Sequence, residues 1–343
     1  MNQFLKTAGL AVTLAGSLAL SAFGASAQEF VLKAHHFLST KHNTHAKVLK
    51  PWADKIEAES KGRIKIQIYP SMQLGGKPPQ LLDQVRDGVA DIVWALPGYT
   101  PGRYPKVAAF ELPFMVSTAE ATSQALQEYY EKYARDEFKD IHPLWFHTHA
   151  RGFFHTREGL IKTVGDLKGK KMRAPNRGIG TAMEKLGAGS IFMPVPALPE
   201  ALSKGVVDGA ALPWEIVPAL KVNELAPYHT EIGGDRGLYT AVFVFAMNKD
   251  KYNSLPDDLK KVIDDNSGLM MAKSTGKVWD AGEEHGIAVS KKSGNEIFTL
   301  PDSETDKIRE MTKSVTEKWI ADMGADGQKL YDDANALLDK YSK

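Results

Sequence analysis

The chain has 343 residues, with 43 Lys and Arg against 42 Asp and Glu, and it contains no cysteine. The missing thiols exclude a disulfide framework, a zinc–thiolate site and a cysteine nucleophile. The balanced charge argues against nucleic acid or an anionic membrane surface as a partner, because either would need a basic excess.

The first 27 residues are typical of a secretory signal peptide. They carry one charge, at Lys6, then an apolar run over residues 8–20 and the small-residue site Ala25-Ser26-Ala27. We therefore expect export and cleavage near Ala27. No later apolar stretch reaches the roughly 18 residues of a membrane span. The expected new N-terminus, Gln28, has no cysteine for a lipid anchor, so the mature protein is expected to be free in the periplasm.

Strands that alternate with helices predict an α/β fold with mainly parallel strands, and the length favours two domains. In the first third, strands are expected over residues 31–34, 63–69 and 90–96, and helices over 48–62 and 78–88. The C-terminal third is expected to be helical. Its helices run from 256 through Ser267 toward Val278, from 302 to 324, and from 330 to 341.

A weak internal repeat links residues 62–97 with residues 169–213. In both, a Gly and a basic residue open a strand ending at a Pro, a helical stretch ends at a Gly, and a Val-x-Asp leads into a strand ending Leu-Pro. Chance similarity is the alternative, since these residue types are common. Two such units predict two similar lobes, whose ligand lies beyond the carboxyl ends of the strands. The candidate site is therefore residues 96–99, 173–176 and 213–215.

Two histidine pairs, His35/His36 and His147/His149, allow two interpretations. If the lobes met, the pairs could hold a metal and serve a periplasmic metal-assisted hydrolase. Alternatively they are packed histidines around an aromatic pocket, because no Asp or Glu completes a ligand set. No metalloprotease, serine-hydrolase, phosphate-loop or EF-hand motif occurs.

Two arginines fall near the predicted cleft, Arg173 at a strand end and Arg151 after the strand over residues 144–149. A guanidinium is permanently charged and holds a carboxylate with two parallel hydrogen bonds. Aromatic residues crowd the same loops and would form apolar walls for the body of such an anion. They include Phe37, Trp94, Tyr99, Trp214 and Tyr239.

Several motifs, in this order, resemble the solute-binding proteins of tripartite ATP-independent periplasmic (TRAP) transporters. They include Gly62-Arg63-Ile64-Lys65-Ile66, Asp87-Gly88-Val89-Ala90-Asp91, the run from Asp166-Leu167-Lys168-Gly169 to Arg173-Ala174-Pro175, and Gly205-Val206-Val207-Asp208-Gly209. The resemblance implies a type II periplasmic-binding-protein fold with two lobes. Lobe I would hold residues 28–148 and 240–278, and lobe II residues 149–239 and 279–343. A long helix bridging the lobes is expected around Trp214 to Leu225.

The resemblance further implies a receptor that closes on an organic carboxylate and delivers it to a membrane permease, as a monomer, without a cofactor and without catalysis. A sensor subunit that presents the ligand to a signalling partner is a third possibility. Arg173 matches the family arginine that pairs with the substrate carboxylate, and Arg151 matches a second arginine that assists it.

Departures from the family pattern favour a monocarboxylate with an apolar, aromatic or hydroxylated body. Leu212 stands where an Asn is common, Val195-Pro196-Ala197 replaces an aromatic-Ser-Glu run, and Leu96 fills a position that can be acidic. Glu215 is expected either to accept from a ligand hydroxyl, to help hold a cation, or to be a solvated helix-start residue. The predicted ligand-binding set is Arg173, Arg151, Trp214, Glu215, Phe37, Trp94, Leu96, Tyr99, Pro213 and Tyr239.

Overall fold

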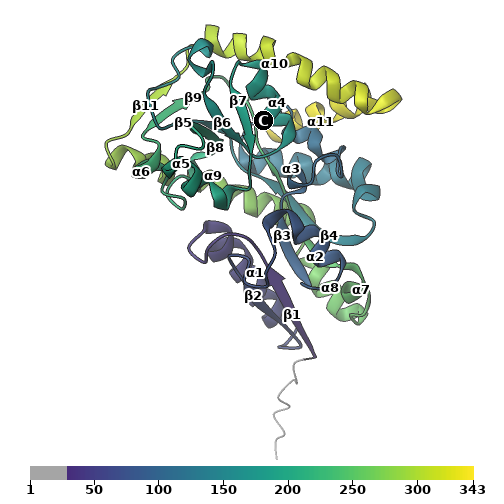
Figure 1. Cartoon of the computed structure of the whole chain (residues 1–343). Helices are drawn as coiled ribbons and strands as arrows, with labels where there is room; N and C mark the ends of the chain where they lie inside the picture. The colour runs from purple at the N-terminus through teal and green to yellow at the C-terminus, as the bar shows by residue number, and fades with distance from the viewer. Residues whose placement is uncertain (1–28) are drawn as a thin grey trace, which may run out of the picture.

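The computed structural model describes residues 29–343, so the predicted signal peptide lies outside the described residues. Two β-sheets form two α/β layers: the first holds the N-terminal strands β1 to β3 together with β4 and β10, and the second holds the other strands (Figure 1). The first sheet has the order β2-β1-β3-β10-β4, and the second β11-β9-β5-β8-β6-β7. The strands are β1 Phe30–His35, β2 Ile64–Tyr69, β3 Ile92–Ala95, β4 Ile141–Thr148, β5 Phe153–Thr156, β6 Lys171–Ala174, β7 Gly189–Phe192, β8 Gly209–Leu212, β9 Tyr228–Glu231, β10 Val242–Asn248 and β11 Glu296–Thr299.

Helices cover both sheets and dominate the C-terminal third, as predicted. Within the described residues, no helix combines the length and apolar character that a membrane span requires. The helices are α1 Lys50–Glu59, α2 Leu81–Arg86, α3 Ala119–Tyr129, α4 Arg177–Lys185, α5 Leu198–Ser203, α6 Val222–Leu225, α7 Lys249–Asn253, α8 Asp257–Asp265, α9 Gly268–Lys292, α10 Asp302–Asp322 and α11 Gly327–Tyr341.

Each sheet is mixed, whereas the sequence predicted mainly parallel pairing. Strand β10 is antiparallel to β3 and β4, and β5 is antiparallel to β8 and β9. Both exceptions follow a segment that crosses from one sheet to the other, β4 to β5 and β9 to β10. A strand that enters a sheet from the neighbouring lobe is not bound by the helix crossover that makes consecutive strands parallel.

The internal repeat is real in the structure, but its alignment differs from the predicted one. Asp91 accepts from the backbone N–H of Lys33 at 2.8 Å, and Asp208 accepts from that of Lys171 at 2.7 Å. The sheet orders β2-β1-β3 and β7-β6-β8 therefore correspond. The sequence analysis had matched β6 with β2, but in the structure β6 corresponds to β1. The difference arises because strand β7 lies inside the stretch that was predicted to be helical.

The predicted position of the bridging helix is wrong. Residues 214–216 form one short helical turn and α6 spans only Val222–Leu225. The long helix is α9, which was expected to continue from α8. A break at Asn266 separates the two, since the Asn266 carbonyl accepts from the buried indole Nε1 of Trp52 at 2.8 Å.

Helix α9 contacts both layers at glycines. A Cβ built on Gly276 would lie 2.5 Å from Glu120 Cα at the start of α3, and one on Gly286 would lie 2.0 Å from the Trp214 carbonyl oxygen. Between these points, the Asp280 carboxylate accepts from the first two N–H groups of α3, at 2.7 and 2.9 Å. One rigid helix thus fixes the distance between α3 and the loop after β8.

Helix α11 packs against α3, where the Tyr341 hydroxyl donates to Glu128 and the Tyr133 hydroxyl to Asp333. The sequence analysis assigned residues 279–343, which include α11, to lobe II, and residues 28–148, which include α3, to lobe I. This division of the chain into lobes stays a prediction.

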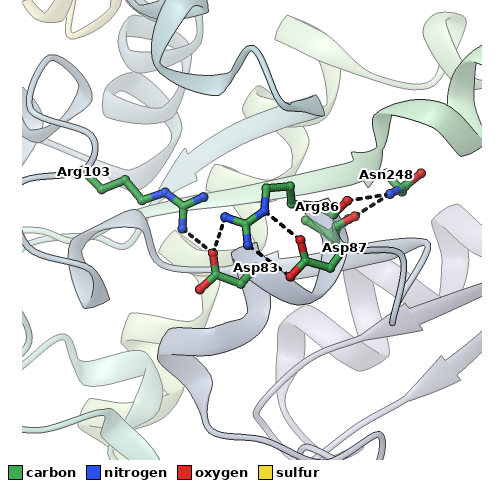
Figure 2. A network of polar contacts seen from close by, with 6 residues as sticks. Asp83, Arg86, Asp87, Arg103 and Asn248 are labelled. Carbon is green, nitrogen blue, oxygen red and sulfur yellow. Dashed lines mark hydrogen bonds and ion pairs between the residues drawn. The ribbon is translucent and has the colours of Figure 1, made fainter.

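A polar network ties α2 to β10 and to the loop after β3 (Figure 2). Asn248, at the end of β10, donates through Nδ2 to the carbonyls of Val85 and Arg86 at 2.7 and 3.1 Å. Arg103 donates to Asp83 at 2.7 Å. These bonds hold the segment that follows the strand end at Leu96.

We expect Gly286→Ala to lower the free energy of unfolding by about 1–3 kcal/mol, because its methyl group would overlap the Trp214 carbonyl. The matched control is Gly178→Ala on α4, whose added Cβ would meet nothing closer than 3.5 Å. That change should be neutral or stabilise by up to about 1 kcal/mol. Urea denaturation followed by circular dichroism measures both, and equal effects would contradict the role given to Gly286.

Candidate ligand-binding site

A cavity of about 380 Å³, including its mouth, lies between the two sheets. The centres of water-sized molecules reach only about 40 Å³ of this space, so the enclosed part is small. Its walls come from the ends of β1, β3, β6 and β8, from the segments that cross between the sheets, and from α9. The lining residues are Phe37, Leu38, Leu96, Tyr99, His149, Arg173, Pro175, Val195, Leu212, Pro213, Ile216, Tyr239, Ala241, Phe243 and Trp279.

Arg173 is the one charged side chain among the lining residues, and it is only 1% exposed. Its Nε donates to the Met193 carbonyl at 3.0 Å and its Nη1 to the Ala211 carbonyl at 3.5 Å, while the buried Nη2 has no partner. No Asp or Glu within residues 29–343 forms an ion pair with it. Because a buried charge is costly unless it is paired, the cavity is suited to an anion.

Two tyrosines stand beside this guanidinium. The Tyr99 oxygen accepts from the backbone N–H of Val195 at 3.0 Å, which leaves its own proton free to donate. Burial raises the pKa of both Tyr99 and Tyr239, so both hydroxyls stay protonated. The Tyr239 ring fits because residue 152 is glycine, since a Cβ there would lie 1.9 Å from the ring. The end of the cavity that is suited to an anion therefore offers two neutral hydroxyl groups, those of Tyr99 and Tyr239, around the positive guanidinium of Arg173.

His149 forms a neutral part of the wall. Its Nε2 accepts from the backbone N–H of Ala241 at 3.0 Å, so the proton is on Nδ1, which donates to the Ala150 carbonyl at 2.5 Å. Burial, with a smaller contribution from the Arg173 charge, lowers the pKa of His149 to about 3. Both nitrogens are occupied, so this side chain has none left for a metal or for proton transfer.

The remaining walls are apolar and partly flat. The Phe37 ring stacks on Trp94 with centroids 4.7 Å apart, and Trp94 stacks on Phe243 at 5.3 Å. Trp94 is itself held by a bond from its Nε1 to His147 Nε2 at 2.9 Å. Such a surface matches a planar apolar ligand body.

The structure brings six of the ten predicted site residues to this cavity: Phe37, Leu96, Tyr99, Arg173, Pro213 and Tyr239. Four lie elsewhere. Trp94 is behind Phe37, and Trp214 points away to donate to Glu231 at 2.9 Å. Glu215 lies 3.1 Å from His42 Nε2, and Arg151 donates to the Gly234 carbonyl at 2.6 Å.

The predicted ligand-binding set omits nine lining residues, although one of them, Pro175, lies in the predicted site segment 173–176. Several are one or two positions from a predicted residue and follow from the same strand ends, namely Leu38, Pro175, Leu212, Ile216 and Ala241. Trp279, by contrast, comes from α9, and no local signal marks it. The close approaches of Gly282 to the Glu215 side chain and of Gly286 to the Trp214 carbonyl bring this helix to the loop after β8. Val195, His149 and Phe243 complete the set.

The two histidine pairs do not meet. They lie at the ends of β1 and β4 in the same sheet, with β3 and β10 between them. Across the part of the chain that the structure describes, no group of three or more His, Cys, Asp or Glu side chains is arranged to hold a metal. The premise that two facing lobes would join these pairs is therefore wrong.

A family model described as "Bacterial extracellular solute-binding protein, family 7" matches residues 34–322. The chain belongs to this family. Family 7 proteins are substrate-binding receptors and not enzymes, so the hydrolase alternative has no support. They bind small carboxylates, work with membrane permease components, and are typically periplasmic.

Solved structures of TRAP solute-binding proteins are similar to this family 7 chain over almost its whole length. One from a marine metagenome, specific for aromatic acid ligands and bound to 3-hydroxybenzoate, is 50% identical, covers 92% of this chain and 100% of its own, and has a TM-score of 0.90. One from Rhodoferax ferrireducens with copurified benzoate is 47% identical, covering 91% and 98%, with a TM-score of 0.89. One from Bordetella bronchiseptica with bound mandelate is 28% identical, covering 90% and 99%, with a TM-score of 0.84.

Beside the cavity, the buried carboxyl group of Glu111 joins segments from both sheets of this family 7 protein. Its Oε1 accepts from the backbone N–H of Val242 at 3.0 Å, and a Cβ built on Gly98 would lie 2.8 Å from the same oxygen. The Asn176 side chain, before α4, is also close enough to lower its pKa slightly. Burial is the larger effect and raises the pKa of Glu111 to about 7.

This raised pKa predicts a pH-dependent effect of Glu111→Gln. A carboxyl group whose folded-state pKa exceeds its unfolded value contributes stability at low pH that is lost as the pH rises through about 7. The amide does not titrate, so the variant should gain about 2 kcal/mol relative to the parent between pH 5 and pH 8. Urea denaturation at both pH values measures the gain, and a pH-independent difference would contradict the assignment.

Proposed function

We propose that this receptor captures an aromatic monocarboxylate in the periplasm and delivers it to the permease of a TRAP transporter. The observation that carries the proposal is the Arg173 guanidinium, buried without a carboxylate partner and with Nη2 unpaired, in a cavity whose other walls are apolar or neutral. A carboxylate supplies the missing charge, and a planar ring matches the Phe37 and Phe243 surfaces.

The ligands of related receptors support this class. The marine protein is specific for aromatic acids, and the Rhodoferax protein retained benzoate through purification. Both are about half identical to this chain over more than nine-tenths of it. A small aromatic acid also agrees with the small size of the cavity in this chain.

Capture requires the two lobes to close on the ligand, with the binding energy shifting an open–closed equilibrium. We keep the predicted lobes, residues 28–148 with 240–278 and residues 149–239 with 279–343, as part of this proposal. Arg173 and Pro213 would approach the ligand from lobe II, and Phe37, Leu96 and Tyr99 from lobe I.

The residues outside the cavity take supporting roles in this proposal. Trp94 backs the Phe37 wall, and Trp214 holds the loop after β8 through its bond to Glu231. Arg151 would stabilise the segment that crosses between the sheets through its bond to Gly234, and would not touch the carboxylate.

We also propose that the exported protein begins at Gln28 and works as a monomer. Intact-mass measurement of the periplasmic protein tests the cleavage after Ala27. Size-exclusion chromatography with light scattering tests the monomer.

Arg173→Ala should weaken binding of benzoate by about tenfold to a hundredfold, because a charge-assisted bond to a buried group is worth about 1.5–3 kcal/mol. Isothermal titration calorimetry measures this. The matched control is Arg151→Ala, which also removes one guanidinium but lies outside the cavity and should change the affinity by less than threefold. Unchanged affinity in the Arg173 variant would contradict the proposal.

The natural ligand is best sought by mass spectrometry of the small molecules that copurify with the protein. Thermal-shift screening of aromatic, aliphatic and dicarboxylic acids then ranks the classes, because a ligand that binds only the folded state raises the melting temperature. The largest shifts are expected for benzoate-like acids, and a clear preference for C4-dicarboxylates would overturn the proposed class.

A further inference from the structure

Trp279 is the one tryptophan of this chain whose indole N–H is buried without a hydrogen-bond partner. All six tryptophans lie in the part of the chain that the structure describes. The other five Nε1 groups each donate, at 2.8–3.2 Å, to Asn266, His147, Thr275, Glu231 and Pro105. A buried donor left without an acceptor costs about 1–3 kcal/mol. We therefore expect the Trp279 indole N–H to bind an acceptor when the receptor is loaded.

The unpaired indole lies at the cavity wall. Trp279 is 2% exposed and lines the cavity from α9, with its ring 5.2 Å from that of Phe243. The ring of His149 is 6.3 Å from that of Trp279 and 5.1 Å from that of Tyr239, the tyrosine beside Arg173. Because both His149 nitrogens are already bonded, that side chain does not satisfy the indole.

The surroundings of Trp279 determine which acceptor it suits. The His42 ring is 5.5 Å from the indole, and His42 Nε2 lies 3.1 Å from the Glu215 carboxylate. The buried carboxyl group of Glu283 accepts from the backbone N–H groups of Trp214 and Glu215. Burial raises the pKa of Glu283 to about 8, so this group is neutral at pH 7. The Glu215 carboxylate near this end would repel a second carboxylate on the ligand, whereas a neutral hydroxyl accepts from the indole without adding charge.

We propose that Trp279 is a specificity-determining residue whose Nε1 donates a hydrogen bond to a hydroxyl group on the ring of the bound aromatic carboxylate. The receptor therefore prefers hydroxylated aromatic acids to their unsubstituted parents and to aromatic dicarboxylates. This inference rests on the proposed function, in which Arg173 holds the carboxylate. Trp279 would be a second anchor for the ligand, in addition to Arg173.

The test is a calorimetric comparison of benzoate, 3-hydroxybenzoate, 4-hydroxybenzoate, 3-methylbenzoate, 4-methylbenzoate and isophthalate. In the parent protein, one hydroxybenzoate should bind at least fivefold more tightly than benzoate and than its own methyl analogue, and isophthalate should bind more weakly than benzoate. In Trp279→Phe, which keeps an aromatic wall but removes the donor, the hydroxyl preference should fall below twofold. Any change in benzoate affinity itself does not enter the readout, which is the ratio of hydroxy to unsubstituted acid within each protein.

The matched control is Phe37→Leu, which alters the opposite apolar wall. It should weaken all of these ligands by similar factors and preserve the hydroxyl preference. A preference that persists in Trp279→Phe would overturn the inference, and so would its absence in the parent protein, which would mean that a buried water satisfies the indole.

The outcomes separate the two proposals. If benzoate binds but no hydroxyl preference exists, the role of Trp279 fails and the proposed function stands. If none of the aromatic acids binds, the proposed function fails and the inference falls with it. If Trp279→Phe does not fold, the parent protein's ratio of hydroxy to methyl analogues decides the inference by itself.

Discussion

The buried guanidinium of Arg173 is the constraint on which the rest of the site depends. Two backbone carbonyls orient it, one Nη atom is left unpaired, and no acidic side chain of the described chain neutralises it. A protein that only had to be stable would place a carboxylate there, because breaking or omitting a buried ion pair is expensive. An empty cavity closed around this charge is therefore disfavoured, and an anionic ligand removes the penalty.

Helix α9 determines how the second half of the cavity is built around that charge. Glycines allow it to touch α3 at one point and the Trp214 carbonyl at another, and Asp280 caps α3 between them. The same helix carries Trp279 into the cavity wall. One element that contacts both layers thus shapes this side of the cavity, while the segments after β1, β3, β6 and β8 supply other parts of the wall.

Much of this arrangement could be predicted from local patterns. Strand ends in an open α/β sheet converge, so Leu96, Arg173 and Pro213 could be placed together before any coordinates were considered. Trp94 lies near the end of β3 and Trp214 follows β8, yet neither lines the cavity. Which way an aromatic side chain points depends on partners far along the chain, here His147 for Trp94 and Glu231 for Trp214.

Long-range contacts explain the other errors. The break between α8 and α9 involves Trp52, more than 200 residues earlier, which binds the Asn266 carbonyl, and Gly268, whose φ of 65° is a local signal that the helix pattern passed over. The repeat was misaligned because strand β7 lies within a stretch that reads as helical. In the corrected alignment, set by Asp91 and Asp208, the counterpart of Arg173 is His35, which is bonded to Gln84. One lobe thus carries the anchor charge at a position where the other carries a bonded neutral side chain.

A crystal structure of the protein with bound 3-hydroxybenzoate tests the central claim most directly. We expect a ligand carboxylate oxygen about 2.7–2.9 Å from Arg173 Nη2, the range of a charge-assisted bond, with the ring against Phe37 and Phe243. A complex in which the carboxylate contacts another group and Arg173 Nη2 remains without a partner would contradict it.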